Sequence, residues 1–208
     1  MGAKHNKTKS RIPLFSILEI GNTMAGKTAL LESYKYMLNN KIEYDEKNNK
    51  PLDLDISTIM MTISTDFKVL ESTIKEEQNE DKRIKVKIWD SIGAERFSST
   101  VISTAKNAQG LLFTYDITSR RTFKDLDEWI NKIQNISEFP IIIVGCKVDL
   151  EDKREVSTEE GHTFAAKYKC PFFETSARTG KGVKEAFSAL IQKVYEKNKN
   201  KNNLFGLY

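Results

Sequence analysis

The most informative part of the chain reads Gly21-Asn22-Thr23-Met24-Ala25-Gly26-Lys27-Thr28. It fits the pattern G-x-x-x-x-G-K-[ST], in which glycines let the backbone curl so that its N–H groups point at a phosphate. In that pattern the lysine places a positive charge on the outer phosphates and the last hydroxyl is offered to Mg²⁺. The predicted phosphate contacts are Asn22, Thr23, Met24, Ala25, Gly26, Lys27 and Thr28.

The residues on either side of this loop have the patterns of a strand and a helix. Leu14 to Ile20 is apolar enough for a buried strand, and residues 28–34 have helical spacing. The loop would then lie at a helix N-terminus, where backbone N–H groups and the helix dipole attract anions. This context favours nucleotide phosphate binding over the alternative, a plain glycine turn.

Composition limits the class of protein. The chain has 208 residues, a net charge of +4 and 30% charged residues, which fits one domain. The basic excess gathers at the chain ends rather than along one helix, which argues against nucleic acid as a partner. No apolar run approaches the ~20 residues that span a bilayer. Cys146 and Cys170 have no neighbours typical of a metal site, and two cysteines without a disulfide fit a reducing compartment. We expect a cytoplasmic protein, and a monomer.

Strand and helix patterns alternate along the rest of the chain. Residues 66–74 and 83–89 alternate apolar and polar positions as a hairpin does, with the charged run 75–82 at its tip. The pattern predicts a three-layer α/β fold: a mostly parallel six-stranded sheet with one antiparallel edge strand and helices on both faces. Further strands are expected at 108–115, 140–146 and 172–174, helices at 121–134, 158–168 and 181–195, and a long exposed loop at 39–55.

A second motif, Asp90-Ser91-Ile92-Gly93, directly follows a predicted strand. Asp90 can hold Mg²⁺ through its water shell, and the Gly93 N–H can meet a terminal phosphate. An ordinary turn that begins with aspartate is the alternative reading. Beside the phosphate loop, the motif predicts an element that reports whether the terminal phosphate is present.

A third motif, Cys146-Lys147-Val148-Asp149, follows another predicted strand. The Asp149 carboxylate can accept two hydrogen bonds from the adjacent donors of guanine, which adenine does not have. The stem of Lys147 can lie along the base plane. The segment Ser176, Ala177 and Arg178 would bring a backbone N–H near the base oxygen.

Together these motifs resemble a Ras-superfamily small GTPase and are most similar to the Rab family. The resemblance also rests on Trp89-Asp90, Glu95-Arg96-Phe97, Tyr115-Asp116-Ile117-Thr118 and Glu174-Thr175-Ser176-Ala177, and it extends over about residues 14–197. It implies a G domain at 13–197, between a flexible basic N-terminal extension (1–12) and a C-terminal tail (198–208).

The resemblance implies a molecular switch in vesicle traffic that binds GTP or GDP with Mg²⁺ and hydrolyses GTP. Its partners would be effector, exchange-factor and GTPase-activating proteins. The corresponding effector surface is Phe67, Trp89 and Phe97, for which simple partial burial is the alternative.

Three residues depart from the family pattern. Ala94 stands where the family usually has the glutamine that orients the attacking water, so we expect slow hydrolysis. Met24 stands where most relatives have glycine. Its backbone N–H can still bind phosphate if the local φ suits a residue with a side chain. Cys146 stands where asparagine is usual. We expect the loss of that asparagine to weaken nucleotide affinity by about 1 kcal/mol, while Asp149 keeps the preference for guanine.

Two assignments have alternatives. We prefer Thr62 as the threonine that completes the Mg²⁺ site, because of its distance to Asp66-Phe67. Thr58, in the local string Ser57-Thr58-Ile59, is the alternative. The C-terminus has no cysteine for prenylation, so Gly2 is a candidate for myristoylation, which with the neighbouring basic residues would attach the protein peripherally to an endomembrane. An unmodified tail is the other reading.

Two further function classes compete with the switch. A pseudo-GTPase scaffold that does not hydrolyse GTP is favoured by the three departures. The retained Lys27, Thr28, Asp90 and Asp149 favour nucleotide binding instead. A P-loop kinase or ATPase would need an acceptor site, and the Lys147-x-Asp149 motif argues against it.

Overall fold

A sheet of six strands, in the order β2-β3-β1-β4-β5-β6, forms the middle of the part of the chain that the structure describes. The structure is a computed structural model that describes residues 12–47, 50–59, 66–76, 79–91, 98–134 and 139–205. Its elements are β1 (Leu14–Ile20), α1 (Lys27–Asn40), η1 (Ile56–Thr58), β2 (Asp66–Glu76), β3 (Asn79–Asp90), α2 (Ser98–Ala105), β4 (Gly110–Asp116), α3 (Arg120–Lys124), α4 (Leu126–Gln134), β5 (Ile141–Cys146), η3 (Val148–Lys153), α5 (Thr158–Lys167), β6 (Phe172–Thr175) and α6 (Val183–Phe205).

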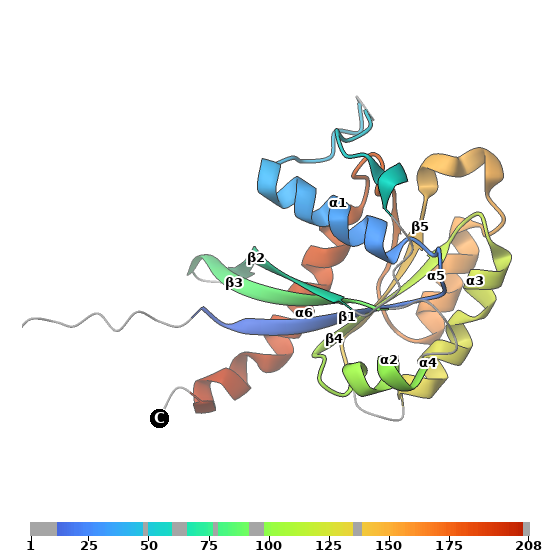
Figure 1. Ribbon diagram of the computed structural model, residues 1–208. Coiled ribbons are helices and arrows are strands. Elements are labelled where there is room, and N and C mark those ends of the chain that lie inside the picture. The colour runs from blue at the N-terminus through green and yellow to red at the C-terminus, as the bar shows by residue number, and fades with distance from the viewer. Residues whose placement is uncertain are drawn as a thin grey trace, which may run out of the picture.

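Helices cover both faces of the sheet. β3, β1, β4, β5 and β6 run parallel, and β2 is antiparallel to β3 at one edge. α1 and α6 pack on one face, and α2, α4 and α5 pack on the other; Figure 1 shows α1 above the sheet and α2 and α4 below it. β4 is therefore buried along its whole length, as expected of a central parallel strand. The predicted fold class is confirmed.

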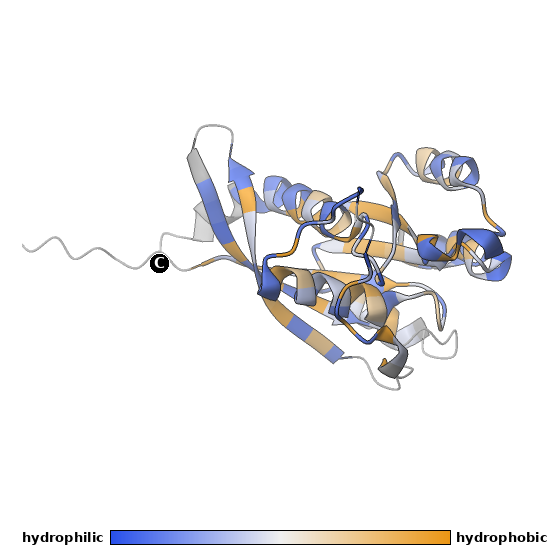
Figure 2. Cartoon of the chain, turned by 90° about the horizontal axis from the view of Figure 1, so that it is seen from above, coloured by the Kyte–Doolittle hydropathy of each residue, from blue (hydrophilic) through white to orange (hydrophobic). Residues whose placement is uncertain are grey.

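Hydrophobic residues concentrate on the central strands, while the hairpin of β2 and β3 alternates between hydrophilic and hydrophobic residues (Figure 2). In β1, Phe15 and Ile17 face α1 and α6, and Leu18 and Ile20 face the opposite layer. By this alternation Glu19 belongs to the face that carries α1. It is fully buried where an apolar residue is expected.

Several predicted boundaries were wrong. The expected helix over 121–134 is divided at Asp125, whose carboxylate accepts a hydrogen bond from Asn22. The hairpin strands continue into the expected tip, where Glu76 pairs with Asn79 beyond a register shift. The last helix continues to Phe205. The expected exposed loop over 39–55 is partly buried, because Ile42, Tyr44 and Leu52 pack against the core.

Candidate functional site

Backbone geometry shapes the phosphate loop between β1 and α1. A Cβ at Gly21 would lie 2.3 Å from the Thr114 carbonyl oxygen, so only glycine fits there. Gly26 caps α1 at a φ of 106° without a side-chain hydrogen bond, and the first turn of α1 has no acidic residue. A helix start of this kind leaves room and a favourable dipole for an anion.

Lys27, the first residue of α1, is buried beneath this loop. Its Nζ donates hydrogen bonds to the carbonyl oxygens of Gly21 at 2.9 Å and Asn22 at 2.8 Å. Burial lowers the pKa of Lys27 to about 8, although Asp90 and Glu19 act in the opposite direction. A phosphate oxygen beside this group would favour its charged form.

Met24 has a left-handed backbone conformation, with a φ of 64°. This conformation is uncommon for a residue with a side chain, and glycine adopts it more readily. The side chain points outward and is 76% exposed. Methionine is therefore accommodated at the mouth of the loop rather than inside it.

Thr28 and Asp90 form the candidate metal site. The Thr28 hydroxyl donates a hydrogen bond to Asp90 Oδ2 at 2.7 Å. Asp90 ends β3 and is paired in register with Glu19 of β1, which places its carboxylate beside the phosphate loop. A hydroxyl and a carboxylate are the hard oxygen ligands that Mg²⁺ prefers, so the residues fit this ion.

The base-binding residues come from the loops after β5 and β6. The Ser176 hydroxyl donates to Asp149 Oδ1 at 2.6 Å and so fixes the orientation of that carboxylate. Lys147 has a left-handed φ of 70°, and its Nζ donates to Asp116 Oδ2 at 2.6 Å. Both side chains are therefore held in place by hydrogen bonds within the protein.

Cys146 lies at the end of β5, between these loops and the phosphate loop. Its Sγ would be 3.4 Å from a Cβ on Gly26, so the thiol fills the space beside that glycine. Burial raises the pKa of this thiol to about 12. Cys146 therefore acts as a small apolar wall and not as a nucleophile.

A cavity of about 360 Å³ joins the two halves of the site. Among the predicted nucleotide-binding residues that the structure describes, Asn22, Ala25, Asp90 and Ser176 do not line it. The Asn22 side chain instead donates to Asp125 and accepts a hydrogen bond from Trp129 Nε1 at 2.9 Å. The predicted residues that do line the cavity are Thr23, Met24, Gly26, Lys27, Thr28, Lys147, Asp149, Ala177 and Arg178.

Sequence reasoning missed several cavity residues, notably Ile56, Ile59 and Leu150. The string Ser57-Thr58-Ile59 was the available signal for the first two. Thr58 lies in η1 between Ile56 and Ile59, whereas the preferred Thr62 lies outside the described residues. Gly2, Gly93, Ala94 and Phe97 also lie outside them.

Comparison with known proteins decides the family. Residues 16–196 match the family model described as Ras family. The chain belongs to the Ras family. It is 33% identical to the Ras-related protein Rab-13 of Rattus norvegicus over 183 residues, which are 87% of this chain and 80% of that protein. It is 34% identical over 192 residues to the Ras-related protein Rab-8B of Pongo abelii and of Homo sapiens, 91% of this chain and 83% of each relative. The predicted resemblance is confirmed: this is a Rab-like small GTPase.

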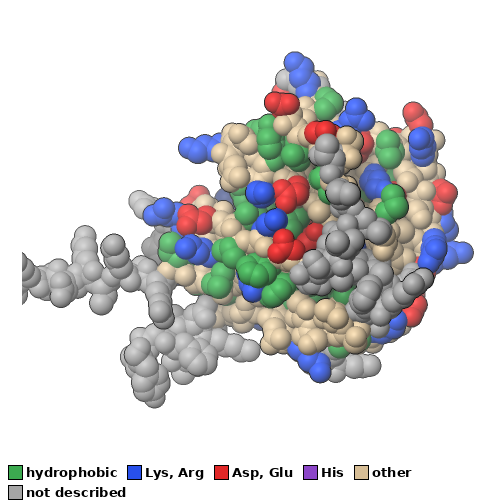
Figure 3. Space-filling view, viewed as in Figure 1, with side chains coloured by type: hydrophobic (Ala, Val, Ile, Leu, Met, Phe, Trp, Pro, Cys, Tyr) green, Lys and Arg blue, Asp and Glu red, His purple; other side chains and the backbone are tan. Residues whose placement is uncertain are grey.

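The Rab-like protein carries an aromatic pair on its hairpin. The rings of Phe67 and Trp89 lie 5.0 Å apart, and Lys87 Nζ lies 3.7 Å and 3.9 Å from their centres. Phe67 is 43% exposed. Hydrophobic side chains gather over β1 to β3 on the face shown in Figure 3. Of the two predicted aromatic residues that the structure describes, Phe67 is exposed, whereas Trp89 is half-buried and packs against the core.

Proposed function

We propose that this Rab-like GTPase is a guanine-nucleotide switch that binds GTP and GDP with Mg²⁺. The observation that carries the proposal is the shared cavity, which brings Lys27 and Thr28 together with Asp149. Ser176 holds the Asp149 carboxylate ready for a base. Lysine, hydroxyl and carboxylate are the groups that phosphates, Mg²⁺ and guanine require.

Each residue has a specific role in this proposal. Lys27 Nζ would donate hydrogen bonds to phosphate oxygens in place of one or both of the carbonyl oxygens of Gly21 and Asn22. The negative phosphate would stabilise the charged form of Lys27. Thr28 and Asp90 would hold Mg²⁺, with Gly93 near the terminal phosphate. Thr62 stays the proposed remaining threonine, and Thr58, whose flanking residues Ile56 and Ile59 line the cavity, is the alternative.

Competition between nucleotides tests the base assignment. The purified protein is loaded with fluorescent GDP in Mg²⁺ and titrated with unlabelled nucleotides. GTP and GDP should displace the label while ATP does not, since adenine offers no adjacent pair of donors to Asp149. Displacement by ATP at the same concentration as GTP would contradict this proposal and favour a P-loop kinase or ATPase.

The rate of hydrolysis separates the switch from its rival. We propose slow GTP turnover, because Ala94 has no side chain to orient the attacking water. The alternative is a pseudo-GTPase scaffold that never hydrolyses GTP. Single-turnover hydrolysis distinguishes a slow rate from none, and a rate typical of a glutamine-containing Rab would contradict the role given to Ala94.

The GTP-bound form would be read by an effector through Phe67 and Trp89, and exchange-factor and GTPase-activating proteins would set its lifetime. Vesicle traffic is the proposed process, with the protein cytoplasmic or peripheral on an endomembrane. Among the described residues, no helix has the length and apolar character needed to cross a membrane. In this proposal, peripheral attachment depends on Gly2 and the basic residues that follow it.

A further inference from the structure

The side chain of Asn22, the second residue of the phosphate loop, is held by two residues of the α3–α4 region. Its Oδ1 accepts a hydrogen bond from Trp129 Nε1 at 2.9 Å, and its Nδ2 donates one to Asp125 Oδ2 at 2.5 Å. Asn22 is 5% exposed and Trp129 is 3% exposed. The amide of Asn22 is therefore enclosed by protein, with a partner at each end.

This arrangement requires an amide at position 22. The indole of Trp129 can only donate a hydrogen bond, and the ionised carboxylate of Asp125 can only accept one. Asparagine offers one acceptor and one donor to this pair. Alanine would leave the buried indole N–H without this partner, and aspartate would set two carboxylates against each other.

The main chain of Asn22 shapes the loop itself. Its carbonyl oxygen accepts a hydrogen bond from the Ala25 N–H at 3.2 Å, which closes the turn, and another from Lys27 Nζ at 2.8 Å. Asn22 therefore connects both the turn and the buried lysine to the α3–α4 region.

The helical region that receives Asn22 is itself firmly packed. Trp129 belongs to the apolar core on the face of the sheet that carries α4, together with Leu126 and Ile130. Asp125 caps the end of α3, and its carbonyl oxygen accepts a hydrogen bond from the Trp129 N–H at 3.2 Å. Because such cores are close-packed, they give the loop a rigid support.

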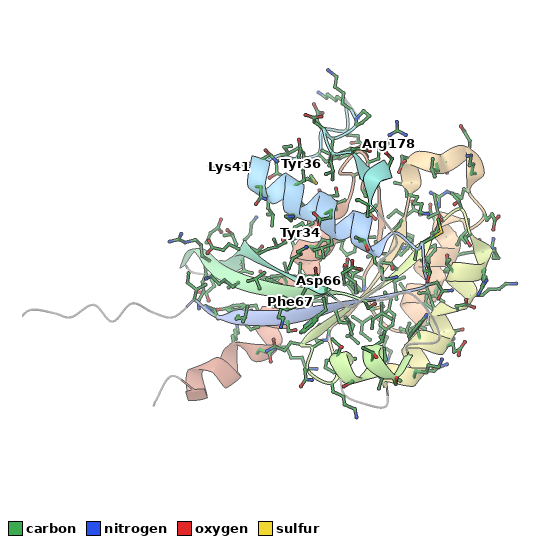
Figure 4. The ribbon with its side chains drawn as sticks, in the orientation of Figure 1. Tyr34, Tyr36, Lys41, Asp66, Phe67 and Arg178 are labelled. Atoms are coloured by element: carbon green, nitrogen blue, oxygen red, sulfur yellow. The ribbon has the colours of Figure 1, made fainter. Side chains whose placement is uncertain are left out.

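The base half of the cavity is held by a different contact. Arg178 lines this half and lies beside η1 (Figure 4). The hydrogen bond from Ser176 to Asp149 fixes the carboxylate that faces the base. The contacts of Asn22 therefore support the phosphate half of the cavity separately from the base half.

We propose that Asn22 is a positioning residue: its amide, fixed between Trp129 and Asp125, holds the phosphate loop and Lys27 in the arrangement that receives the nucleotide phosphates. The inference rests on the proposed function and adds a side chain that acts on phosphate binding through the shape of the loop. Loss of the amide contacts should weaken the binding of nucleotide phosphates and leave the recognition of the base unchanged.

An exchange of the two polar groups tests this role. The Kd for fluorescent GDP in Mg²⁺ is measured for wild type, Asn22→Asp, Asp125→Ala and the double variant Asn22→Asp/Asp125→Asn. Asn22→Asp should weaken GDP binding about tenfold, because the hydrogen bond to Asp125 is replaced by two facing carboxylates. The double variant should return to within about threefold of wild type, because the new amide at position 125 donates to the new carboxylate at position 22, which still accepts from Trp129.

Asp127→Ala is the matched control. Asp127 is a neighbouring aspartate in α4, and its carboxylate accepts a hydrogen bond from Lys167 of α5 at 2.7 Å. Urea denaturation gives the stability of each variant, and Asp127→Ala should keep the wild-type Kd for GDP whatever its stability. Competition with inosine diphosphate, whose base lacks the exocyclic amine of guanine, reports on the base half. Asn22→Asp should lower the affinities for GDP and inosine diphosphate by the same factor.

The outcomes separate this inference from the proposed function. If Asn22→Asp does not fold, Asp125→Ala, at a half-buried position, provides the same test and should weaken GDP binding about threefold. Wild-type affinity in the single variants, or a double variant that binds GDP no more tightly than Asn22→Asp, would overturn the role of Asn22 and leave the proposed function intact. A wild-type protein that takes up no guanine nucleotide would overturn both.

Discussion

Replacing Glu19 with leucine should stabilise this protein. Glu19 is fully buried in β1, and neither carboxyl oxygen has a hydrogen-bond partner among the described residues. Its neighbours on the same face of β1, Phe15 and Ile17, belong to the apolar core. A leucine of similar size would extend that core without an unsatisfied polar group.

The expected gain follows from the cost of the buried carboxyl group. An unsatisfied buried polar group costs about 1–3 kcal/mol, and apolar replacement of buried ionic groups stabilises proteins by about 1–4 kcal/mol. We therefore expect Glu19→Leu to raise the free energy of unfolding by about 2 kcal/mol. For a domain of this size that corresponds to a rise in Tm of roughly 4–8 °C.

The stability of wild type should also depend on pH through Glu19. Burial first, and then the nearby Asp90 carboxylate, raise the pKa of Glu19 well above its ordinary value of 4.5, while Lys27 opposes them. The unfolded chain therefore loses this proton before the folded protein does. The contribution of Glu19 to stability is fully present below about pH 4.5 and is lost as pH rises through the folded-state pKa. Glu19→Gln has no such proton, so its stability relative to wild type should increase with pH.

Urea denaturation followed by tryptophan fluorescence measures these differences at matched GDP and Mg²⁺. The Kd for GDP of each variant is measured in parallel so that ligand stabilisation can be subtracted. Glu71→Leu, at an exposed glutamate of β2, is the matched control and should change stability by less than about 0.5 kcal/mol. A Glu19→Leu protein no more stable than wild type, or a Glu19→Gln protein with the wild-type pH dependence, would refute the reasoning.

Four other outcomes are expected. Asp149→Asn should weaken GDP binding by about tenfold or more, because one acceptor for guanine becomes a donor, and fluorescent-GDP titration measures this loss; an unchanged Kd would contradict the base assignment. Ala94→Gln should raise the single-turnover hydrolysis rate by about tenfold or more, and an unchanged rate would remove Ala94 as the cause of slow turnover. In the folded protein a thiol reagent should label the half-buried Cys170 before Cys146, whose thiol is buried with a pKa of about 12. Mass spectrometry of digests reports the order of labelling. Equal labelling would contradict the burial of Cys146 beside the base-binding loops. Mass spectrometry of protein made in a eukaryotic host should show a myristoyl group on Gly2, and an N-terminus that is only unmodified or acetylated would remove that anchor.

Local motifs allowed the fold class and about half of the residues that line the candidate cavity to be predicted. Lys27, Thr28 and Asp149 were found because each chemical role requires a particular residue at a fixed spacing from a glycine or a strand end. The alternation of strand and helix patterns predicted the layers of the fold. The motif spacings and the strand and helix patterns both depend on residues that are close along the chain.

The remaining features depend on contacts between distant residues. The Asn22 side chain accepts a hydrogen bond from Trp129, which lies 107 residues away in sequence, and no local pattern indicates this contact. The hydrogen bond from the Leu52 N–H to the Arg178 carbonyl oxygen arises in a polar segment without periodicity, which offers no pattern to interpret. Glu19 lies within the strand predicted over 14–20, and no local pattern indicates that its carboxyl group is buried without a hydrogen-bond partner among the described residues.

The nucleotide that the purified protein carries is the most direct test of the account. The protein is denatured, and the released nucleotides are separated by chromatography and quantified against the protein concentration. A guanine nucleotide in near-stoichiometric amount is the predicted result, with GTP retained if hydrolysis is slow. An adenine nucleotide, or no nucleotide from protein that also fails to take up added GDP and Mg²⁺, would contradict the guanine-nucleotide switch.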